Sequence, residues 1–356
     1  MTTLTQTIDE NTLQEFMGKM VGDLGASTSS VLVLIGRRLG LYKALAEHGP
    51  LSAEALAQQT GTAPRYILEW ASNQAASGYV EYDPATEQFY QTPEQAAVFA
   101  DEESSFYLGG GFDSIAAMFA DEPKITEAFR TGEGVSWGTH DSCLFCGVAK
   151  FFKPTYKANL VQSWIPALAG VQEKLEQGGK VADVGCGYGH STLLLAETYP
   201  NSHFYGFDFH EPSIKQAKHL AKEKGLTNVT FGIAKAKDFP GESYDLVTFF
   251  DCLHDMGDPA GAAKHVYSQL DKDGTWMIVE PFAHDTLEQN LNPVGRIYFS
   301  FSATVCTPSS LSQEVGLALG AQAGEKKLRE VVTAGGFTQF RRAAETPFNL
   351  VLEARR

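Results

Sequence analysis

The sequence predicts an α/β protein in which a seven-stranded, doubly wound sheet follows a helical winged-helix domain. Three observations predict this fold. Residues 181–210 read as a strand, a glycine-rich loop, a helix and a second strand that ends in an acidic residue. Strand and helix patterns then alternate through the rest of the chain, as they do in doubly wound sheets. Earlier, helical segments and a short hairpin occupy residues 1–100.

Composition limits the classes of function. The chain has 356 residues, 43% hydrophobic and 20% charged, which is typical of a globular protein of two or three domains. A net charge of −15 disfavours nucleic acids and anionic membranes as partners. The sequence shows neither an apolar run of about 18 residues nor a leader pattern, so we expect a cytoplasmic protein. Five cysteines with a single C-x-x-C pair, Cys143 and Cys146, predict neither a disulfide framework nor a metal site.

The N-terminal 100 residues follow the order of a winged helix. We expect a short helix over residues 13–21, a second helix from Ser27, and capped helices at residues 52–61 and 64–77. Two alternating segments, residues 79–83 and 88–92, then flank a turn.

The charge of this domain argues against DNA binding. The third helix carries one basic residue, Arg65, and residues 1–100 hold five Lys or Arg against eleven Asp or Glu. DNA recognition requires clustered basic residues. We therefore expect residues 1–100 to form a homodimer through their apolar surface.

Residues 101–170 have a mixed pattern. They contain a glycine turn at 109–111, a polar loop around residues 132–142, and a helical segment that we expect to run from Pro154 toward Leu175. We interpret this stretch as a bridging helical region that covers the active site, and residues 171–356 as the cofactor-binding domain.

The glycine-rich loop distinguishes between two kinds of cofactor. Asp183 is followed by Gly185, Gly187 and Gly189, and Ser191 is a good N-cap for the next helix. A dinucleotide loop, G-x-G-x-x-G, requires its third glycine at position 190, which is His190 here. A nicotinamide cofactor is therefore disfavoured.

The strand after this helix ends at Asp208, nineteen residues beyond Gly189. An acid at the tip of this strand can accept hydrogen bonds from both ribose hydroxyls of a nucleoside.

The D-x-G-x-G-x-G pattern resembles motif I of class I S-adenosylmethionine-dependent methyltransferases. The resemblance implies S-adenosylmethionine as cofactor and a seven-stranded sheet that closes with a terminal hairpin. Lys235 stands where the family commonly has an Asp that meets adenine, so we expect the backbone of Ala236 and Lys237 to make that contact. The cofactor-binding residues predicted in this way are Asp183, Gly185, Cys186, Gly187, Gly189, Asp208, Phe209, Lys235, Ala236, Lys237 and Asp251.

A second group of polar residues follows the fourth and fifth strands of the sheet. The segment FFDCLHDMGDP places His254 and Asp255 just past the fourth strand, and Glu280 ends the fifth. Carboxyl ends of neighbouring strands meet at one edge of a doubly wound sheet, so we expect these side chains to lie together. An imidazole flanked by carboxylates can take a proton from a hydroxyl.

These features together resemble small-molecule O-methyltransferases that carry a winged-helix dimerisation domain, and bacterial winged-helix methyltransferases. The resemblance implies that His254 is the general base and that Glu280 orients it, with Asp255 beside them. Met256 replaces a Trp of the plant enzymes. A second flanking Glu of those enzymes has only a provisional match here, Glu314.

The predicted function is methyl transfer from S-adenosylmethionine to a small, hydroxylated and partly apolar molecule. His140, in the loop SWGTHDS, is the alternative base, and His254 could instead be a structural histidine. Two other functions stay open: a winged-helix regulator that senses S-adenosylmethionine, and an N- or S-methyltransferase that uses no histidine base.

Overall fold

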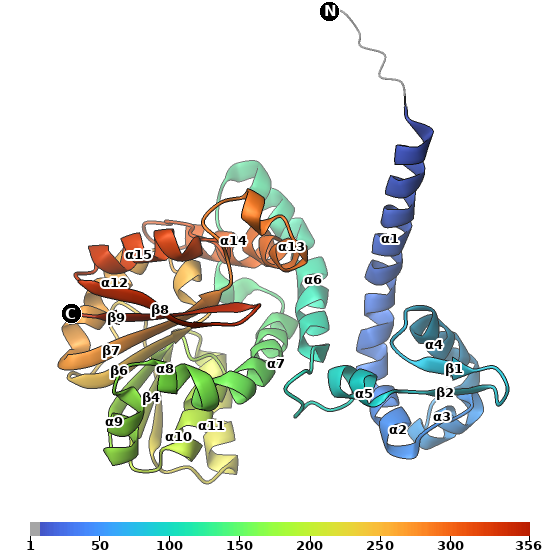
Figure 1. The fold of residues 1–356 in the computed structure, drawn as a ribbon, viewed down its shortest axis with the longest axis horizontal. Coiled ribbons are helices and arrows are strands. Elements are labelled where there is room, and N and C mark those ends of the chain that lie inside the picture. The colour runs from blue at the N-terminus through green and yellow to red at the C-terminus, as the bar shows by residue number, and fades with distance from the viewer. Residues whose placement is uncertain (1–7) are drawn as a thin grey trace, which may run out of the picture. The chain divides into compact units, whose positions relative to one another are not determined.

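The computed structural model describes residues 8–356 and divides into two compact units, Met1–Asp113 and Ser114–Arg356. Figure 1 shows the elements of both units along the chain. This division places residues 101–113 of the expected bridging region with the first unit and the remainder with the second. Within the described residues, we find no helix with the length and apolarity needed to cross a membrane.

The first unit begins with one long helix, α1 (Glu10–Arg38), instead of the two helices that the sequence suggested. Asp9 caps it by accepting a hydrogen bond from the backbone N–H of Thr12 at 2.8 Å. The hydroxyl-rich residues 27–30, after Gly25, suggested the end of one helix and the start of another. In the helix, Ser27 Oγ donates to the carbonyl of Asp23 at 2.8 Å, so its hydroxyl is satisfied without leaving the helix.

The remainder of the first unit confirms the winged-helix prediction. Its further elements are α2 (Leu41–His48), α3 (Ala53–Thr60), α4 (Pro64–Ala76), β1 (Glu81–Asp83), β2 (Gln88–Tyr90) and α5 (Pro93–Phe99). Ser52 caps α3, which ends at Gly61 in the left-handed conformation. The helices and the β-hairpin enclose a core around Leu45, Leu56 and Trp70.

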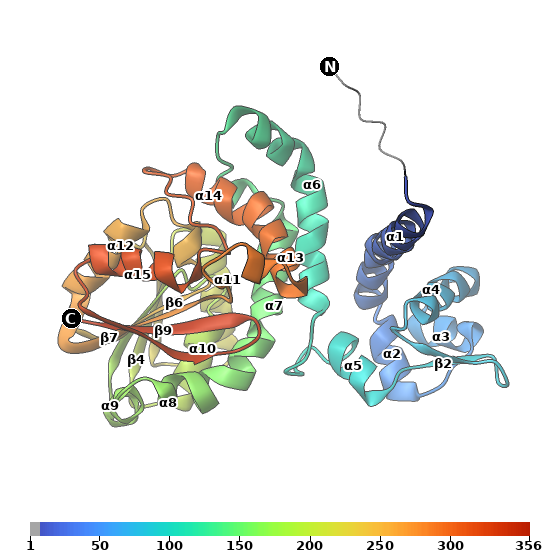
Figure 2. The ribbon, with the colours of Figure 1, turned by 45° about the horizontal axis from the view of Figure 1, so that its top comes forward.

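The second unit contains the predicted seven-stranded sheet, in the order β5-β4-β3-β6-β7-β9-β8. Figure 2 labels β4, β6, β7 and β9 of this sheet. The strands β5, β4, β3, β6 and β7 are parallel, whereas β9 pairs antiparallel with both β7 and β8. The sheet therefore closes with the expected terminal hairpin. The strand bounds are β3 (Lys180–Val184), β4 (His203–Asp208), β5 (Val229–Ile233), β6 (Tyr244–Phe250), β7 (Leu270–Pro281), β8 (Gln339–Glu345) and β9 (Asn349–Arg355).

Helices cover both faces of this sheet. One face packs on α12 (Pro259–Gln269) and α15 (Gly324–Ala334), and the other packs on α9 (Val171–Gln177) and α10 (His190–Thr198). Helix α11 (Glu211–Glu223) packs beside α10 and β5. The remaining helical elements are α6 (Gly109–Thr131), η1 (Trp137–Thr139), α7 (Ser142–Asn159), η2 (Leu160–Trp164), α8 (Ile165–Ala167), η3 (Leu253–Asp255), η4 (Glu288–Asn290), α13 (Pro293–Phe301), η5 (Ser302–Cys306) and α14 (Thr307–Leu311).

The helix expected to begin at Pro154 in fact begins at Ser142. Asp141 is its N-cap and accepts a hydrogen bond from the N–H of Cys143 at 2.9 Å, and Pro154 lies inside α7. The helical path then passes through a π-turn, η2, and breaks at Gly170 before α9. The shifted start matters because the first turns of α7 contribute to the candidate site.

Candidate active site

The glycine-rich loop joins β3 to α10 in a conformation that requires glycine. Gly185 and Gly189 have φ values of 75° and 76°. A Cβ at Gly185 would lie 2.7 Å from Cys252 Sγ, and a Cβ at Gly189 would lie 2.7 Å from the ring of Phe231. The N–H of Gly185 donates to the carbonyl of Phe207 at 2.7 Å and ties the loop to β4. The loop is therefore held close to neighbouring strands, leaving its outer side for a ligand.

Asp183 lies behind this loop. It is buried and is not among the residues that line the cavity, although the sequence placed it among the cofactor contacts. Its carboxylate accepts hydrogen bonds from Ser191 at 2.8 Å, Thr192 at 2.5 Å and Thr248 at 3.1 Å. Gly189, and not Ser191, is the N-cap of α10. Burial raises the pKa of Asp183 to about 6 despite these donors. Asp183 thus shapes the loop from behind.

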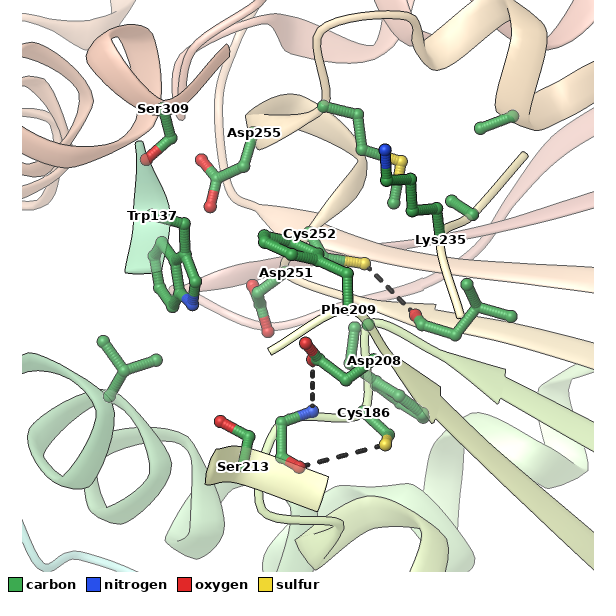
Figure 3. Close-up of a pocket in the computed structure, with 18 of the residues that line it drawn as sticks. Trp137, Cys186, Asp208, Phe209, Ser213, Lys235, Asp251, Cys252, Asp255 and Ser309 are labelled. Carbon is green, nitrogen blue, oxygen red and sulfur yellow. Dashed lines mark hydrogen bonds between the residues drawn. The ribbon is translucent and has the colours of Figure 1, made fainter. Parts of the chain in front are cut away.

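Asp208 ends β4 and faces the cavity (Figure 3). Its Oδ2 accepts from the N–H of Gly187 at 2.9 Å, and its Oδ1 accepts from the N–H of His210 at 2.8 Å. Burial raises the pKa of this carboxyl, and the two backbone donors oppose that shift. The carboxylate is therefore fixed at the loop by main-chain donors. The next residue, Phe209, is 47% exposed and also lines the cavity.

A cavity of about 560 Å³ opens at this edge of the sheet. Its walls come from the glycine-rich loop, the ends of β4 and β6, the loop after β5, the first part of α7, and the segment that follows α14. Cavity-lining residues include Trp137, Phe145, Phe152, Tyr156, Gly185, Cys186, Gly187, Asp208, Phe209, Lys235, Ala236, Lys237, Asp251, Cys252, Asp255, Met256, Ser309, Gln313 and Glu314. Most predicted cofactor residues are thus brought together, whereas Asp183 and Gly189 lie behind them.

The loop after β5 presents its backbone and two lysines to the cavity. Lys235 donates its backbone N–H to Asp238 at 2.9 Å. Lys237 Nζ lies 2.9 Å from Asp258 Oδ2 and also pairs with Glu314. Glu314, the provisional second partner of the histidine, is 70% exposed at its side chain and bonds to Lys237 instead.

Asp251 follows β6 and adopts a strained backbone, with φ of 50°. Its carboxylate accepts from Tyr156 Oη at 3.2 Å and from Asn349 Nδ2 at 3.1 Å. Burial, and then the nearby charge of Glu280, raise the pKa of Asp251 well above its ordinary value. No motif in the sequence indicates Asn349, which comes from the last strand, or Tyr156, which comes from α7.

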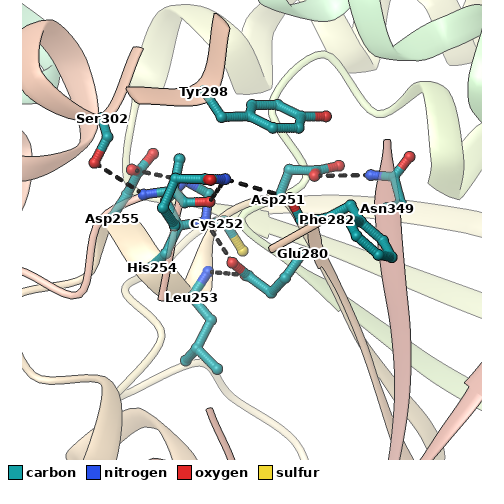
Figure 4. A network of polar contacts seen from close by, with 12 residues as sticks. Asp251, Cys252, Leu253, His254, Asp255, Glu280, Phe282, Tyr298, Ser302 and Asn349 are labelled. Carbon is teal, nitrogen blue, oxygen red and sulfur yellow. Dashed lines mark hydrogen bonds and ion pairs between the residues drawn. The ribbon is translucent and has the colours of Figure 1, made fainter. Parts of the chain in front are cut away.

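His254 lies in η3, between two carboxylates (Figure 4). Its Nδ1 is 2.5 Å from Glu280 Oε2, and its Nε2 is 3.1 Å from Asp255 Oδ1. The other oxygen of Glu280 accepts from the N–H of Leu253 at 2.9 Å. Burial opposes a charge on the ring, but Glu280 and Asp255 together raise the pKa of His254 well above 6.5. The predicted trio is therefore assembled, and the two carboxylates favour a positive charge on the ring.

Access to these three residues differs. His254 and Glu280 are 3% and 2% exposed and do not line the cavity, whereas Asp255 does. The wall of the cavity is thus formed by the carboxylate of Asp255, with the imidazole directly behind it.

His140, the alternative base, lies in a separate cluster. Its Nδ1 is 2.6 Å from Asp121 Oδ2, and its buried Nε2 has no hydrogen-bond partner among the described residues. Lys124 lies 2.8 Å from the same carboxylate of Asp121. His140 does not line the cavity, although Trp137 of the same loop does. The structure thus places His254, and not His140, beside the predicted carboxylates.

Family models match two parts of the chain. Residues 27–101 match the Rv2258c-like winged HTH domain, and residues 175–336 match a methyltransferase domain. An uncharacterized methyltransferase of Bacillus subtilis, YcgJ, is 30% identical over 122 residues, which are 33% of this chain and 47% of that protein. The chain spans less than half the length of the first curated relatives that it matches.

Two solved structures are similar over nearly the whole chain. An O-methyltransferase family protein from Burkholderia thailandensis superposes with a TM-score of 0.69 at 15% identity, covering 95% of this chain and 98% of that one. The human N-acetylserotonin methyltransferase, in complex with S-adenosylmethionine, gives a TM-score of 0.67 at 16% identity, with coverage of 100% and 99%. At this identity the likeness concerns the fold.

Proposed function

We propose that this chain, which joins a winged HTH domain to a methyltransferase domain, transfers the methyl group of S-adenosylmethionine to a hydroxyl of a small, partly apolar molecule. The observation that carries the proposal is the position of His254. It lies between Glu280 and Asp255, directly behind the Asp255 carboxylate, which lines the same cavity as the glycine-rich loop and Asp208. A nucleoside-binding end and a candidate proton acceptor therefore meet at one cavity.

The cofactor end of the cavity suits a cationic nucleoside. Asp208 accepts hydrogen bonds from the ribose hydroxyls, and the backbone of Ala236 and Lys237 meets adenine. Five carboxylates line the cavity, Asp208, Asp251, Asp255, Asp258 and Glu314, against two lysines, Lys235 and Lys237. Lys237 pairs with Asp258 and Glu314. An excess of negative charge attracts the sulfonium and ammonium groups of S-adenosylmethionine. It repels the pyrophosphate of NAD.

The chemical step moves one methyl group and one proton. The acceptor oxygen attacks the sulfonium methyl in line, and the carbon–sulfur bond breaks with its electron pair going to sulfur. The hydroxyl proton passes to Nε2 of His254, which becomes exposed to the cavity when the Asp255 side chain turns aside. Glu280, which keeps its contact with Nδ1, stabilises the resulting imidazolium. Asp255 pairs with the protonated Nε2 when its side chain returns. Holding donor and acceptor in line supplies much of the remaining rate gain.

The acceptor end of the cavity combines apolar walls with a single unsatisfied hydroxyl. Trp137, Phe145 and Met256 line it, which favours an aromatic or otherwise planar acceptor. Ser309 is 1% exposed, and its Oγ has no hydrogen-bond partner in the described part of the chain. A buried hydroxyl normally has a partner. A second polar group on the acceptor fills that role.

The first unit forms a homodimer and does not bind DNA. Apolar side chains are exposed along α1, among them Leu13 at 41%, Phe16 at 56%, Val21 at 64% and Leu24 at 63%. Met17 is exposed as well, so that Leu13, Met17, Val21 and Leu24 recur every three or four residues and lie along one side of the helix. Exposed apolar stretches of this size mark interaction surfaces.

The pattern of charge disfavours DNA as a partner of the first unit. In helix α4, the single basic residue Arg65 is paired with Glu69. A second copy of this chain, with the same apolar helix, is the partner that fits.

The test uses the intact chain with S-adenosylmethionine that carries a labelled methyl group. It is incubated with small-molecule cell extract and with a panel of phenols, amines and thiols, and products are analysed by mass spectrometry. A labelled methyl ether on a hydroxylated aromatic molecule is the expected result. If the labelled methyl group were found only on amines or thiols, the proposed hydroxyl acceptor would be wrong. Absence of transfer together with salt-dependent duplex DNA binding would favour the regulator.

A further inference from the structure

A single glutamine organises the turn that carries the candidate base. Gln313 Oε1 accepts a hydrogen bond from the N–H of Gly257 at 3.1 Å. Gln313 Nε2 donates to the carbonyl of Asp255 at 2.9 Å and to the carbonyl of Ser309 at 3.0 Å. One carboxamide thus bridges the main chain on both sides of Met256 to the end of α14. Backbone groups in such a turn need partners, and here the partners come from a distant segment.

The segment around Gln313 is fastened to the same turn at further points. Ser310 Oγ donates to the carbonyl of Met256 at 2.8 Å, and the N–H of Leu317 donates to the carbonyl of Gly257 at 2.9 Å. A Cβ at Gly257 would lie 2.5 Å from Cβ of Gln313, so the two segments are in close contact at this point. Residues 309–317 therefore bond the carbonyls of residues 255–257 and the N–H of Gly257, while the N–H groups of Asp255 and Met256 donate to the carbonyls of Cys252 and Leu253.

The segment holds a strained conformation. Val315 and Ala318 have φ values of 70° and 51°, which are unfavourable for residues with a Cβ, and most of all for a β-branched valine. Strain of this kind persists where surrounding contacts determine the backbone, and it concentrates at functional sites. These contacts include the Lys237–Glu314 ion pair and the hydrogen bond from the N–H of Ala318 to Ser310 Oγ at 3.0 Å.

We infer that Gln313 is a positioning residue, whose carboxamide sets where Asp255 and His254 lie relative to the methyl donor. It acts through the main chain of residues 255–257, since its contacts are to backbone atoms of that turn. Nothing in the glycine motif or the H-D segment indicates it. The inference rests on the proposed role of His254. Misplacement of catalytic groups by about 1 Å can lower rates by about 10²-fold.

The test compares Gln313→Met with the wild-type chain. Methionine keeps the length of the side chain and removes its three hydrogen bonds. Gln289→Met is the matched control, because Gln289 is exposed and accepts only from Thr286, at 3.1 Å. Gln313→Glu is the second variant. It keeps an acceptor for Gly257 and loses the donor to Asp255 and Ser309. Both variants are used with S-adenosylhomocysteine as the probe ligand.

The first measurement is the titration of His254 by NMR of the full, isotope-labelled chain, with His254→Gln to assign the signal. Glu280 on β7 and Cys306 on η5 lie beside the ring and are unchanged by the substitution, so a change in Gln313→Met reports the position of Asp255. In Gln313→Glu the new carboxylate opposes a fall in the pKa. We expect Gln313→Met to lower the proton affinity of His254 by about tenfold, which is one pKa unit. Gln313→Glu should lower it to a smaller extent.

The second measurement is amide hydrogen exchange at Gly257, which should become at least about tenfold faster in Gln313→Met, the loss expected for one hydrogen bond. Binding of S-adenosylhomocysteine should stay within about threefold of wild type. A wild-type titration of His254 in both Gln313 variants, with the Gly257 amide still protected, would overturn the inference. Failure of wild type to bind S-adenosylhomocysteine would instead count against the proposed function.

Discussion

The two units differ in which residues depart from the usual pattern of burial: ionisable groups are buried in the second unit, and apolar side chains are exposed in the first. In the second unit, ionisable groups are buried: Asp183, Asp208, His254 and Glu280 lie at the carboxyl edge of the sheet. In the described part of the first unit, the fully buried polar residues are Ser29 and Gln74, and its unusual feature is an exposed apolar helix. Buried charge is costly unless it is paired or used. The contrast supports the proposal that the second unit carries the chemistry and that the first unit associates with a second copy.

In the described part of the first unit, the largely buried charge of Arg37 is used in packing contacts. Arg37 Nη1 lies 2.7 Å from Asp113 Oδ2, and Arg37 Nε donates to Tyr107 Oη at 2.7 Å. These groups satisfy one another and leave nothing directed at a cavity. In the second unit, by contrast, Asp208, Asp251 and Asp255 all line one.

The strongest test of the contrast removes the candidate base. His254→Gln should lower the turnover of methyl transfer by about 10²–10⁴-fold, the usual contribution of a general base. Affinity for S-adenosylhomocysteine should change little, because Asp208 and the glycine-rich loop are untouched. Steady-state assays with the acceptor found by the labelling screen check this. His219→Gln, an exposed histidine near Glu223, is the control. A variant that keeps more than about a third of the turnover would make His254 structural and direct attention to His140.

The buried carboxyl behind the loop should affect stability. Burial raises the pKa of Asp183 to about 6 in the folded chain, from the ordinary 3.8 of an aspartate. Because the folded value is the higher one, its stabilising contribution is complete below about pH 4 and is lost as pH rises through 6. The loss amounts to about 3 kcal/mol. In Asp183→Asn, stability measured by urea unfolding should depend less on pH between 4 and 7. Equal pH dependence in both proteins would contradict this.

The pH dependence of turnover sharpens the assignment of the base. The pKa of His254 is raised above 6.5 by Glu280 and Asp255 in spite of its burial. The ring must be neutral to accept a proton, so turnover should increase about tenfold per pH unit up to that raised pKa. The midpoint should lie above 6.5 and should disappear in His254→Gln. A midpoint below 6.5, or a flat profile in wild type, would be inconsistent with a base held between two carboxylates.

Substitutions on the exposed side of α1 should have the smallest effect, and this effect is on dimerisation. Val21→Glu combined with Leu24→Glu places charges on the apolar side of α1 and should weaken dimerisation by at least about tenfold, since burial of each side chain stabilises by about 1.5–3 kcal/mol. Sedimentation velocity measures the dimer. Lys19→Gln, on the same helix, is the control and should leave association unchanged. A wild-type chain that stays monomeric at high concentration would refute the role assigned to the first unit.

The sequence predicted those parts of the structure that depend on local pattern. The glycine-rich loop, the seven strands, the winged helix and the meeting of His254 with Asp255 and Glu280 all follow from spacing along the chain. The single helix α1 was not predicted. Hydroxyl groups such as that of Ser27 donate to backbone carbonyls of the preceding turn, so they do not end the helix. The start of α7 was also misplaced, because Pro154 resembled a first-turn proline and Asp141 was not recognised as its cap.

Contacts between distant residues account for the rest of what the sequence could not predict. Asn349 is 98 residues from Asp251, and Gln313 is 58 residues from Asp255. Such pairs depend on which strands and loops become neighbours. The same reason explains why Glu314 was considered as a partner of the histidine although it pairs with Lys237. Local pattern identifies the reacting groups, and long-range packing determines what positions them.

The most direct test of the account is calorimetry of the intact chain with S-adenosylhomocysteine and, separately, with NAD. We predict one S-adenosylhomocysteine bound per chain and no binding of NAD. Asp208→Ala should weaken binding by about 1.5–3 kcal/mol, the scale of hydrogen bonds to a charged group, whereas the exposed control Asp273→Ala should bind as wild type does. Binding of NAD without S-adenosylhomocysteine, or full affinity in Asp208→Ala, would contradict the assignment of this cavity to a methyl donor.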